Sequence, residues 1–100
     1  MKELVIPPAA QSDDHSWELL RAWVAGGRLH CSLNVGVYEA EGIPEEEAWG
    51  IILADAARHV ADALSSLGLR DSEAALTAIR RNFEAELDNP TSTRSGNLVQ

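Results

Sequence analysis

Residues 44–67, with the sequence PEEEAWGIILADAARHVADALSSL, decide the fold because their pattern is that of a long amphipathic helix. At about 100° per residue, a mainly large apolar row and a row of small residues run side by side along it. The apolar row is Trp49, Ile52, Leu53, Ala56, Val60, Ala63, Leu64 and Leu67, and the small row is Gly50, Ala54, Ala57 and Ala61. We expect the apolar row to pack on a sheet and the small row to admit a neighbouring helix.

The ends of this helix are marked in the sequence. Pro44 suits the first helical position, and three glutamates follow at residues 45–47, where the helix dipole favours negative charge. Gly68 is predicted to end the helix as its C′ residue. A second helix is predicted over residues 72–87, with Ser72 as N-cap. Its core face is Leu76, Ile79, Phe83 and Leu87.

Three short strands are predicted before the helices, at residues 2–6, 17–25 and 28–38. Gly26-Gly27 separates the last two and supplies the positive φ angles of a type I′ hairpin turn. A two-residue turn sets Ala25 opposite Arg28 and fixes which residues share a face. A three-residue loop would slip this register by one and carry Arg21 into the core, which is costly for an unpaired charge.

In the favoured register, one hairpin face is predicted to be core and carries Glu18, Leu20, Ala22, Val24, Leu29, Cys31, Leu33 and Val35. The other face, which we call the hairpin face, carries Trp17, Leu19, Arg21, Trp23, His30, Ser32 and Asn34. The element order predicts an α+β domain: a small, mainly antiparallel sheet of three short strands, with two C-terminal helices packed on one side. Residues 1–88 form the predicted domain, and residues 89–100 are expected to be a mobile tail.

Composition narrows the classes of function. Sixteen acidic and eight basic side chains among 100 residues give a net charge of -8, which disfavours binding to nucleic acid and to anionic membranes. A single cysteine excludes an internal disulfide framework, and the opening MKELVIPP does not resemble a secretion signal. We therefore expect a cytoplasmic protein.

Two stretches carry a resemblance to a known family. The runs SWELLRAWVAGGRLHCSLNVG and GIPEEEAWGIILADAARHVADAL resemble a family of small bacterial proteins known only as a domain of unknown function. The resemblance covers about residues 1–96, and WELLRAWVA and AWGIILADAARH are its most distinctive parts. It implies a compact domain with no assigned activity, cofactor or catalytic residue, so no functional residue is carried over.

The polar clusters have simple structural interpretations. Asp55, Arg58, His59 and Asp62 share one side of the first helix, where ion pairs are more common than a metal site that lacks a third ligand. The run at residues 13–16, Asp-Asp-His-Ser, is typical of a turn. Cys31 lies in an apolar alternation, where burial suppresses reactivity. We predict no catalytic residue, no metal ligand and no cofactor.

The hairpin face is the remaining candidate, and three interpretations of it stay open. A register error, or a chain terminus folded over the face, would make its tryptophans ordinary core. Alternatively, the face is an interface that forms a homodimer or binds another protein, since Trp and Arg often dominate binding energy. As a third possibility, Arg21 holds an anionic small molecule beside His30 and Asn34. An enzyme on this surface would use His30 as a base, but Ser32 lies about 7 Å along the strand, too far to bond it directly.

Overall fold

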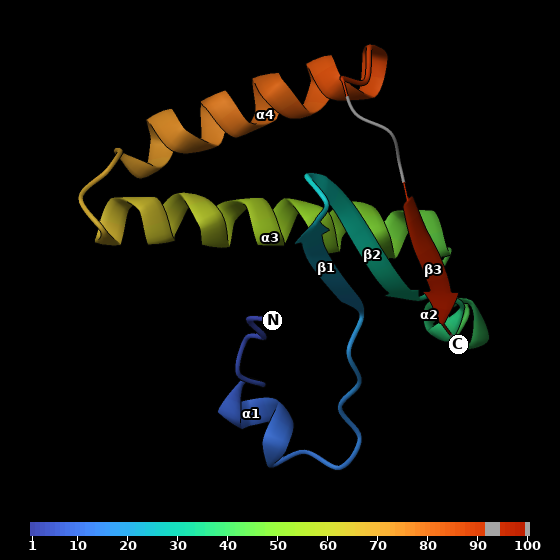
Figure 1. Cartoon of the computed structure of the whole chain (residues 1–100). Coiled ribbons are helices and arrows are strands. Elements are labelled where there is room, and N and C mark those ends of the chain that lie inside the picture. The colour runs from blue at the N-terminus through green and yellow to red at the C-terminus, as the bar shows by residue number, and fades with distance from the viewer. Residues whose placement is uncertain (92–94, 100) are drawn as a thin grey trace.

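The computed structural model describes residues 1–91 in full and the backbone of residues 95–99. The chain has mixed α and β structure, in line with the predicted class (Figure 1). Its helices are α1 Pro8–Gln11, α2 Val37–Ala40, α3 Glu45–Ser66 and α4 Ser72–Asp88, and its strands are β1 Leu20–Ala25, β2 Arg28–Asn34 and β3 Ser95–Val99. None of the helices in the described ranges is long and apolar enough to cross a membrane.

The antiparallel hairpin of β1 and β2 has the predicted register. Gly26 and Gly27 have φ angles of 59° and 73°, as a type I′ turn requires. Ala25 lies opposite Arg28, and Trp23 lies opposite His30. The alternative register, which would bury the Arg21 side chain, is therefore wrong.

Two of the three predicted strands are present with shorter bounds, and the third is not. Residues 2–6 do not form a strand, because Pro7 and Pro8 start α1 immediately afterwards and the Gln11 side-chain amide donates to the Ile6 carbonyl oxygen at 2.8 Å. β1 begins at Leu20 rather than at residue 17. Instead, the backbone of β3 runs parallel to β2, giving the strand order β1-β2-β3.

The predicted strand over residues 28–38 also ends early, at Asn34. Gly36 has a φ angle of 105°, which a strand does not accommodate, and α2 follows it. The prediction of a mobile tail over residues 89–100 stays a prediction, and residues 92–94 and 100 lie outside the described residues.

Both long helices are close to their predicted bounds. α3 has Pro44 as its N-cap, and Gly68 follows it with a φ angle of 72°. α4 begins at Ser72, but its N-cap is Asp71, whose carboxylate accepts from the Ala74 backbone N–H at 3.1 Å. The predicted cap was therefore one residue late.

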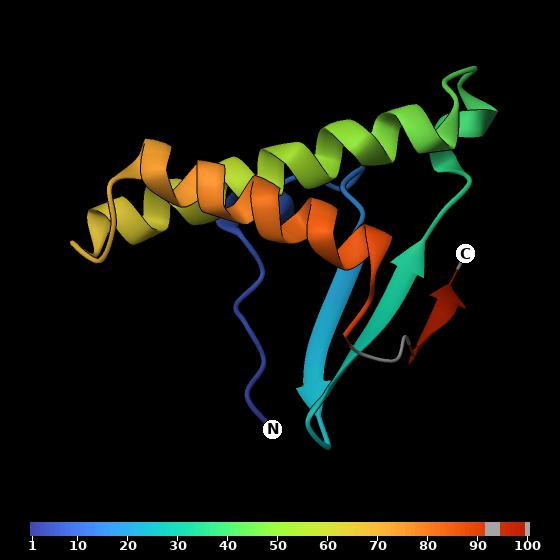
Figure 2. The ribbon, with the colours of Figure 1, turned by 90° about the horizontal axis from the view of Figure 1, so that it is seen from above.

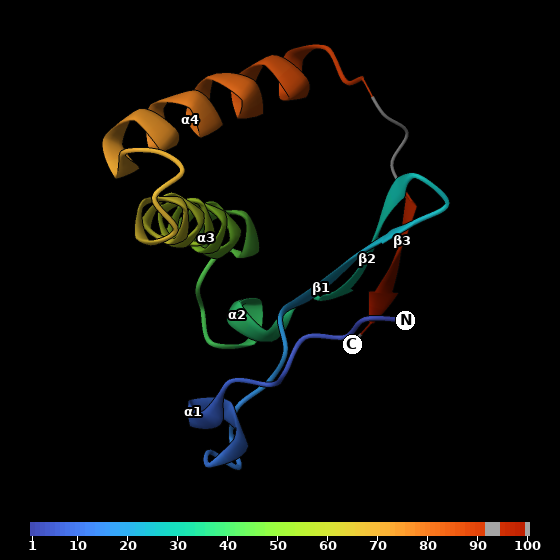
Figure 3. The same cartoon turned by 60° about the vertical axis from the view of Figure 1, so that its left-hand side comes forward.

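Only the C-terminal part of the small row of α3 is covered as predicted: Ala61 is buried and Ala57 is half-buried, whereas Gly50 and Ala54 are exposed. Ala61 is 2% exposed, Ala75 of α4 is 5% exposed, and α3 and α4 contact each other. They run antiparallel from the loop that joins them and diverge toward the C-terminus of α4 (Figures 1 and 3). The only buried apolar residues among those described are these two alanines and Ala48.

The apolar row of α3 is not covered by the sheet. Leu53, Val60 and Leu67 are 41%, 51% and 73% exposed. The 22 residues of α3 span about 33 Å, whereas a six-residue strand spans about 20 Å, and the hairpin lies toward the N-terminal half of α3 (Figures 1 and 2). Among the described elements, α4 and α2 are those that pack against α3, and the strands leave its apolar row largely uncovered.

Candidate functional site

The aromatic end of the hairpin face packs on α2. The Trp17 and Tyr38 rings meet edge to face, with centroids 6.2 Å apart and planes at 62°. Trp17 is still 45% exposed, and Trp23 is half-buried. The face is therefore partly covered by the chain itself.

Arg21 is neutralised by two carboxylates. Its Nη1 donates to Glu3 at 2.6 Å, and its Nε and Nη2 donate to Glu18 at 2.7 and 3.0 Å. The hydrogen bond from Arg21 lowers the pKa of Glu18, and the bond to Glu18 raises the pKa of Arg21. A guanidinium paired in this way is a poor anion receptor, which weakens the small-molecule interpretation.

The remaining polar groups of the face bond to the hairpin backbone or lie across from β1. His30 Nε2 lies 3.2 Å from the Ala25 carbonyl oxygen, and the Asn34 backbone N–H donates to the Leu19 carbonyl oxygen at 3.0 Å. Ser32 lies opposite Arg21. This arrangement provides no base aimed at a nucleophile.

The N-terminal segment lies beside the hairpin face. Residues 2–7, residues 16–18 and residues 20–23 are among those that line a groove of about 660 Å³. The Glu3 carboxylate reaches Arg21 across it, yet Leu4 and Val5 are 92% and 83% exposed. The segment thus contacts the face without burying its own large apolar side chains.

The junction between the hairpin and α3 is organised by Glu45. Its carboxylate accepts from the backbone N–H groups of Gly36, Tyr38 and Glu39 at 2.8 to 3.1 Å, and from Trp49 Nε1 at 3.0 Å. In return, the Glu45 N–H donates to the Glu39 carboxylate at 3.1 Å. These bonds, led by that from Gly36, lower the pKa of Glu45. The sequence predicted a dipole role for this residue but not the junction.

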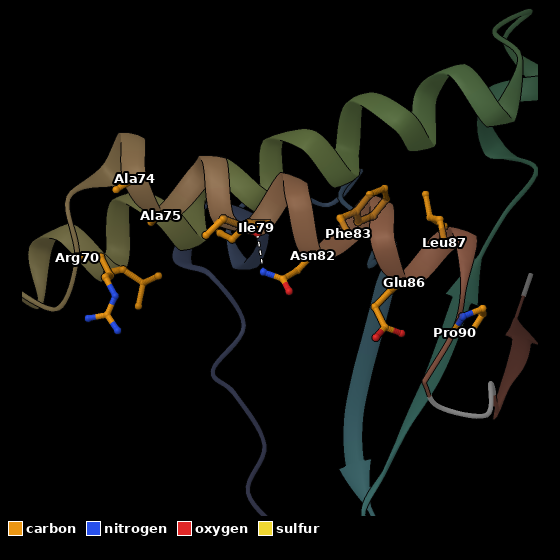
Figure 4. Close-up of a pocket in the computed structure, with 11 residues that line it drawn as sticks. Arg70, Ala74, Ala75, Ile79, Asn82, Phe83, Glu86, Leu87 and Pro90 are labelled. Atoms are coloured by element: carbon orange, nitrogen blue, oxygen red, sulfur yellow. Dashed lines mark hydrogen bonds between the residues drawn. The ribbon is translucent and has the colours of Figure 1, made fainter.

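A groove of about 920 Å³ runs along α4 (Figure 4). Phe83 and Leu87 line it and are 50% and 67% exposed. The Glu86 carboxylate, on the same helix, accepts from the Thr91 N–H at 2.9 Å and from its hydroxyl at 2.6 Å, and these bonds lower the pKa of Glu86. Glu86 thus holds the chain where it leaves α4.

A third groove, of about 470 Å³, lies where α3 and α4 diverge. Leu53 and Ala57 of α3 and Ile79, Phe83 and Leu87 of α4 line it. The sequence identified these apolar side chains, but as core covered within the chain. They lie instead at an open surface.

The polar clusters match their structural interpretations where contacts are present. Arg58 lies 3.8 Å from Asp55 in an exposed pair. The His15 N–H donates to the Asp13 carboxylate at 2.9 Å, as expected for a turn. In the part of the chain that the structure describes, no group of three or more potential metal ligands comes together. Cys31 is half-buried.

Comparison with known proteins identifies the family. The profile of the family described as "Domain of unknown function (DUF5076)" matches residues 3–91. The chain belongs to this family. A solved structure described as "a putative pyruvate dehydrogenase", from the photosynthetic bacterium Rhodopseudomonas palustrus CGA009, is similar over all of this chain and 97% of that one. The two are 30% identical, with a TM-score of 0.72, and no curated protein matches.

Membership of the DUF5076 family confirms the resemblance seen in the sequence. It brings no assigned activity, and the dehydrogenase description applies to the other protein. The function of this chain therefore has to be argued from its surface.

Proposed function

We propose that this DUF5076 protein is a self-associating module whose folded form is a homodimer. The observation that carries the proposal is the size of its surface. The chain exposes 8358 Å², whereas a folded monomer of 10.8 kDa exposes about 5,500 Å². The excess is about 2,800 Å² per chain, or about 5,600 Å² for two chains, which is at the upper end of the total area that obligate homodimers bury.

The dimensions of the chain support the same conclusion. Its Cα radius of gyration is 15.3 Å, against about 13 Å for a compact domain of 100 residues. Within the described residues, no large side chain is fully buried. A chain that covers so little apolar surface gains too little from burial to offset its ordering entropy alone.

A twofold symmetric dimer would cover the exposed apolar surface with a second copy of the same chain. The same patch on each subunit then buries its counterpart. The hairpin face remains one candidate contact, because Trp17 and Trp23 retain exposed ring surface. Binding to a different protein through that face is the second form of the proposal.

Trp23→Lys tests whether the hairpin face forms part of the dimer contact. If Trp23 lies in the contact, the charged side chain raises the dimer dissociation constant while the helical circular dichroism at high protein concentration is retained. Equilibrium sedimentation over a dilution series measures this constant. An unchanged constant removes Trp23 from the contact, and loss of structure at every concentration assigns its ring to the core of the chain.

A ligand would give a different signature from self-association. The melting temperature of a dimer rises with protein concentration, whereas that of a ligand-binding monomer rises with ligand and is independent of protein concentration. Thermal melts over a hundredfold range of protein therefore test the proposal without knowledge of any ligand.

A further inference from the structure

One surface stands out among the exposed apolar groups, and we call it the α4 ridge: Ile79, Phe83 and Leu87. These residues follow one another at helical spacing in the C-terminal part of α4, so they form one continuous row. Ile79 is half-buried, and the exposed fraction is 50% for Phe83 and 67% for Leu87. Exposure increases along the row as α4 diverges from α3 (Figure 3).

All three ridge residues line both grooves that flank α4, one of about 920 Å³ and one of about 470 Å³. The ridge is therefore uncovered on two sides. In Figure 4 the Phe83 and Leu87 side chains project from one edge of the α4 ribbon and the polar Asn82 and Glu86 side chains from the other, and all four line the wider groove. An amphipathic helix of this kind normally buries its apolar side.

A contact through the hairpin face alone is too small to account for the excess exposed surface of the chain. A standard interface takes about 800 Å² from each partner, which is less than a third of the excess of about 2,800 Å² derived from the size scaling of folded monomers. A further apolar surface must then be covered in the dimer. The α4 ridge and the grooves beside it provide that surface.

The charges at the rim of the narrower groove suit a second copy. Arg80 and Glu84 line this groove one helical turn apart, so the rim carries both signs. Among the described residues neither has an ion-pair partner in its own chain. A twofold axis through this region would place Arg80 of each copy near Glu84 of the other, which makes the patch self-complementary.

We infer that the α4 ridge of one chain packs into the groove between α3 and α4 of a second copy, so that two helical pairs form a four-helix layer about a twofold axis. This inference rests on the proposed function and locates its main contact. The layer follows the ordinary packing of antiparallel helical bundles, with α3 supplying Leu53 and the small side chain of Ala57 opposite the incoming ridge.

Leu87→Lys is the direct test, with Leu69→Lys as matched control. Leu69 is 55% exposed in the loop between α3 and α4 and lines neither groove. We expect Leu87→Lys to raise the dimer dissociation constant by about 30-fold or more, as at an interface hot spot. We expect Leu69→Lys to leave it within about threefold, as for a surface substitution away from the contact.

A charge swap keeps the test decisive if Leu87→Lys fails to fold. Arg80→Glu alone sets like charges against Glu84 across the axis, and Glu84→Arg alone sets them against Arg80. Mixed together, the two variants restore both cross-axis pairs. We therefore expect native mass spectrometry of the mixture to show heterodimers above the statistical share.

These experiments test the homodimer and its contact through the α4 ridge separately. A wild-type monomer at all concentrations overturns the proposed function. A wild-type dimer that Leu87→Lys leaves intact, or a statistical mixture of the charge-swapped chains, overturns the inference about the α4 ridge and leaves the homodimer standing. Weakening by Trp23→Lys alone would place the contact on the hairpin face.

Discussion

The hairpin and the helical pair differ in how their polar and apolar groups are satisfied within the chain. The hairpin has its predicted register, and its charged Arg21 is paired with Glu3 and Glu18. In the helical pair only small residues, Ala61 and Ala75, are buried between the described parts of α3 and α4, and larger side chains such as Phe83 and Leu87 remain exposed. Local turn chemistry therefore fixes the hairpin register within one chain, but it does not bury the predicted core face of the hairpin, where Leu20, Val24 and Leu29 are 38%, 78% and 53% exposed. The apolar rows of both regions require a further surface to cover them.

The largest change in the free energy of unfolding is expected at the buried alanine of α3, in the helical pair. Ala61→Leu should lower the free energy of unfolding by about 1–3 kcal/mol, because extra methylenes in a closely packed contact force the helices apart. Ala63→Leu, at an exposed position of the same helix, is the control and should change it by less than about 0.5 kcal/mol. Urea unfolding at one fixed protein concentration measures both. Equal effects would contradict the assignment of Ala61 to the contact between the helices.

The next largest change in the free energy of unfolding is expected at the hairpin turn. Gly27→Ala should lower the free energy of unfolding by about 1–2 kcal/mol, because a φ angle of 73° is unfavourable for a residue with a Cβ atom. Gly27→Asn should cost less, since asparagine tolerates the left-handed region. Thermal unfolding of the two variants gives the comparison. An alanine variant as stable as the asparagine variant would argue against the type I′ turn.

The smallest change in stability is expected at the junction between the hairpin and the helical pair. Because the pKa of folded Glu45 lies below its ordinary value of 4.5, its carboxylate stabilises the fold above pH 4.5, and this contribution is lost as the pH falls through the folded pKa. Glu45→Gln should reduce stability at neutral pH and flatten the acid dependence below pH 4.5.

The control for the junction is Glu46→Gln, which removes the same charge from the same helical turn. Chemical unfolding from pH 3 to 7 is the measurement, over about the range in which carboxylates titrate. An identical acid profile for the two variants would show that Glu45 does not hold the junction.

Sequence patterns predicted the local features of the fold well. Gly26-Gly27 defined the hairpin register because glycine readily adopts the positive φ angles that a type I′ turn requires, whatever its tertiary contacts. The bounds of α3 followed from Pro44 and Gly68 in the same way. Family membership was also predictable, from the distinctive runs around Trp17 and Trp49.

Features that depend on distant contacts were predicted less well. Residues 2–6 have strand-forming side chains but no strand pairing, and Gly36 ends β2 where the apolar alternation continues to Val37. Phe83 and Leu87 were correctly assigned to an apolar face, but the pattern cannot specify whether the cover comes from the same chain. The Glu45 junction was missed because its partners are backbone N–H groups, which have no signature in the sequence.

Solution mass across a dilution series tests the central claim most directly. Light scattering combined with circular dichroism should give a folded species of twice 10.8 kDa that loses helical signal as it dissociates. A species of 10.8 kDa that stays folded at all concentrations would contradict the account.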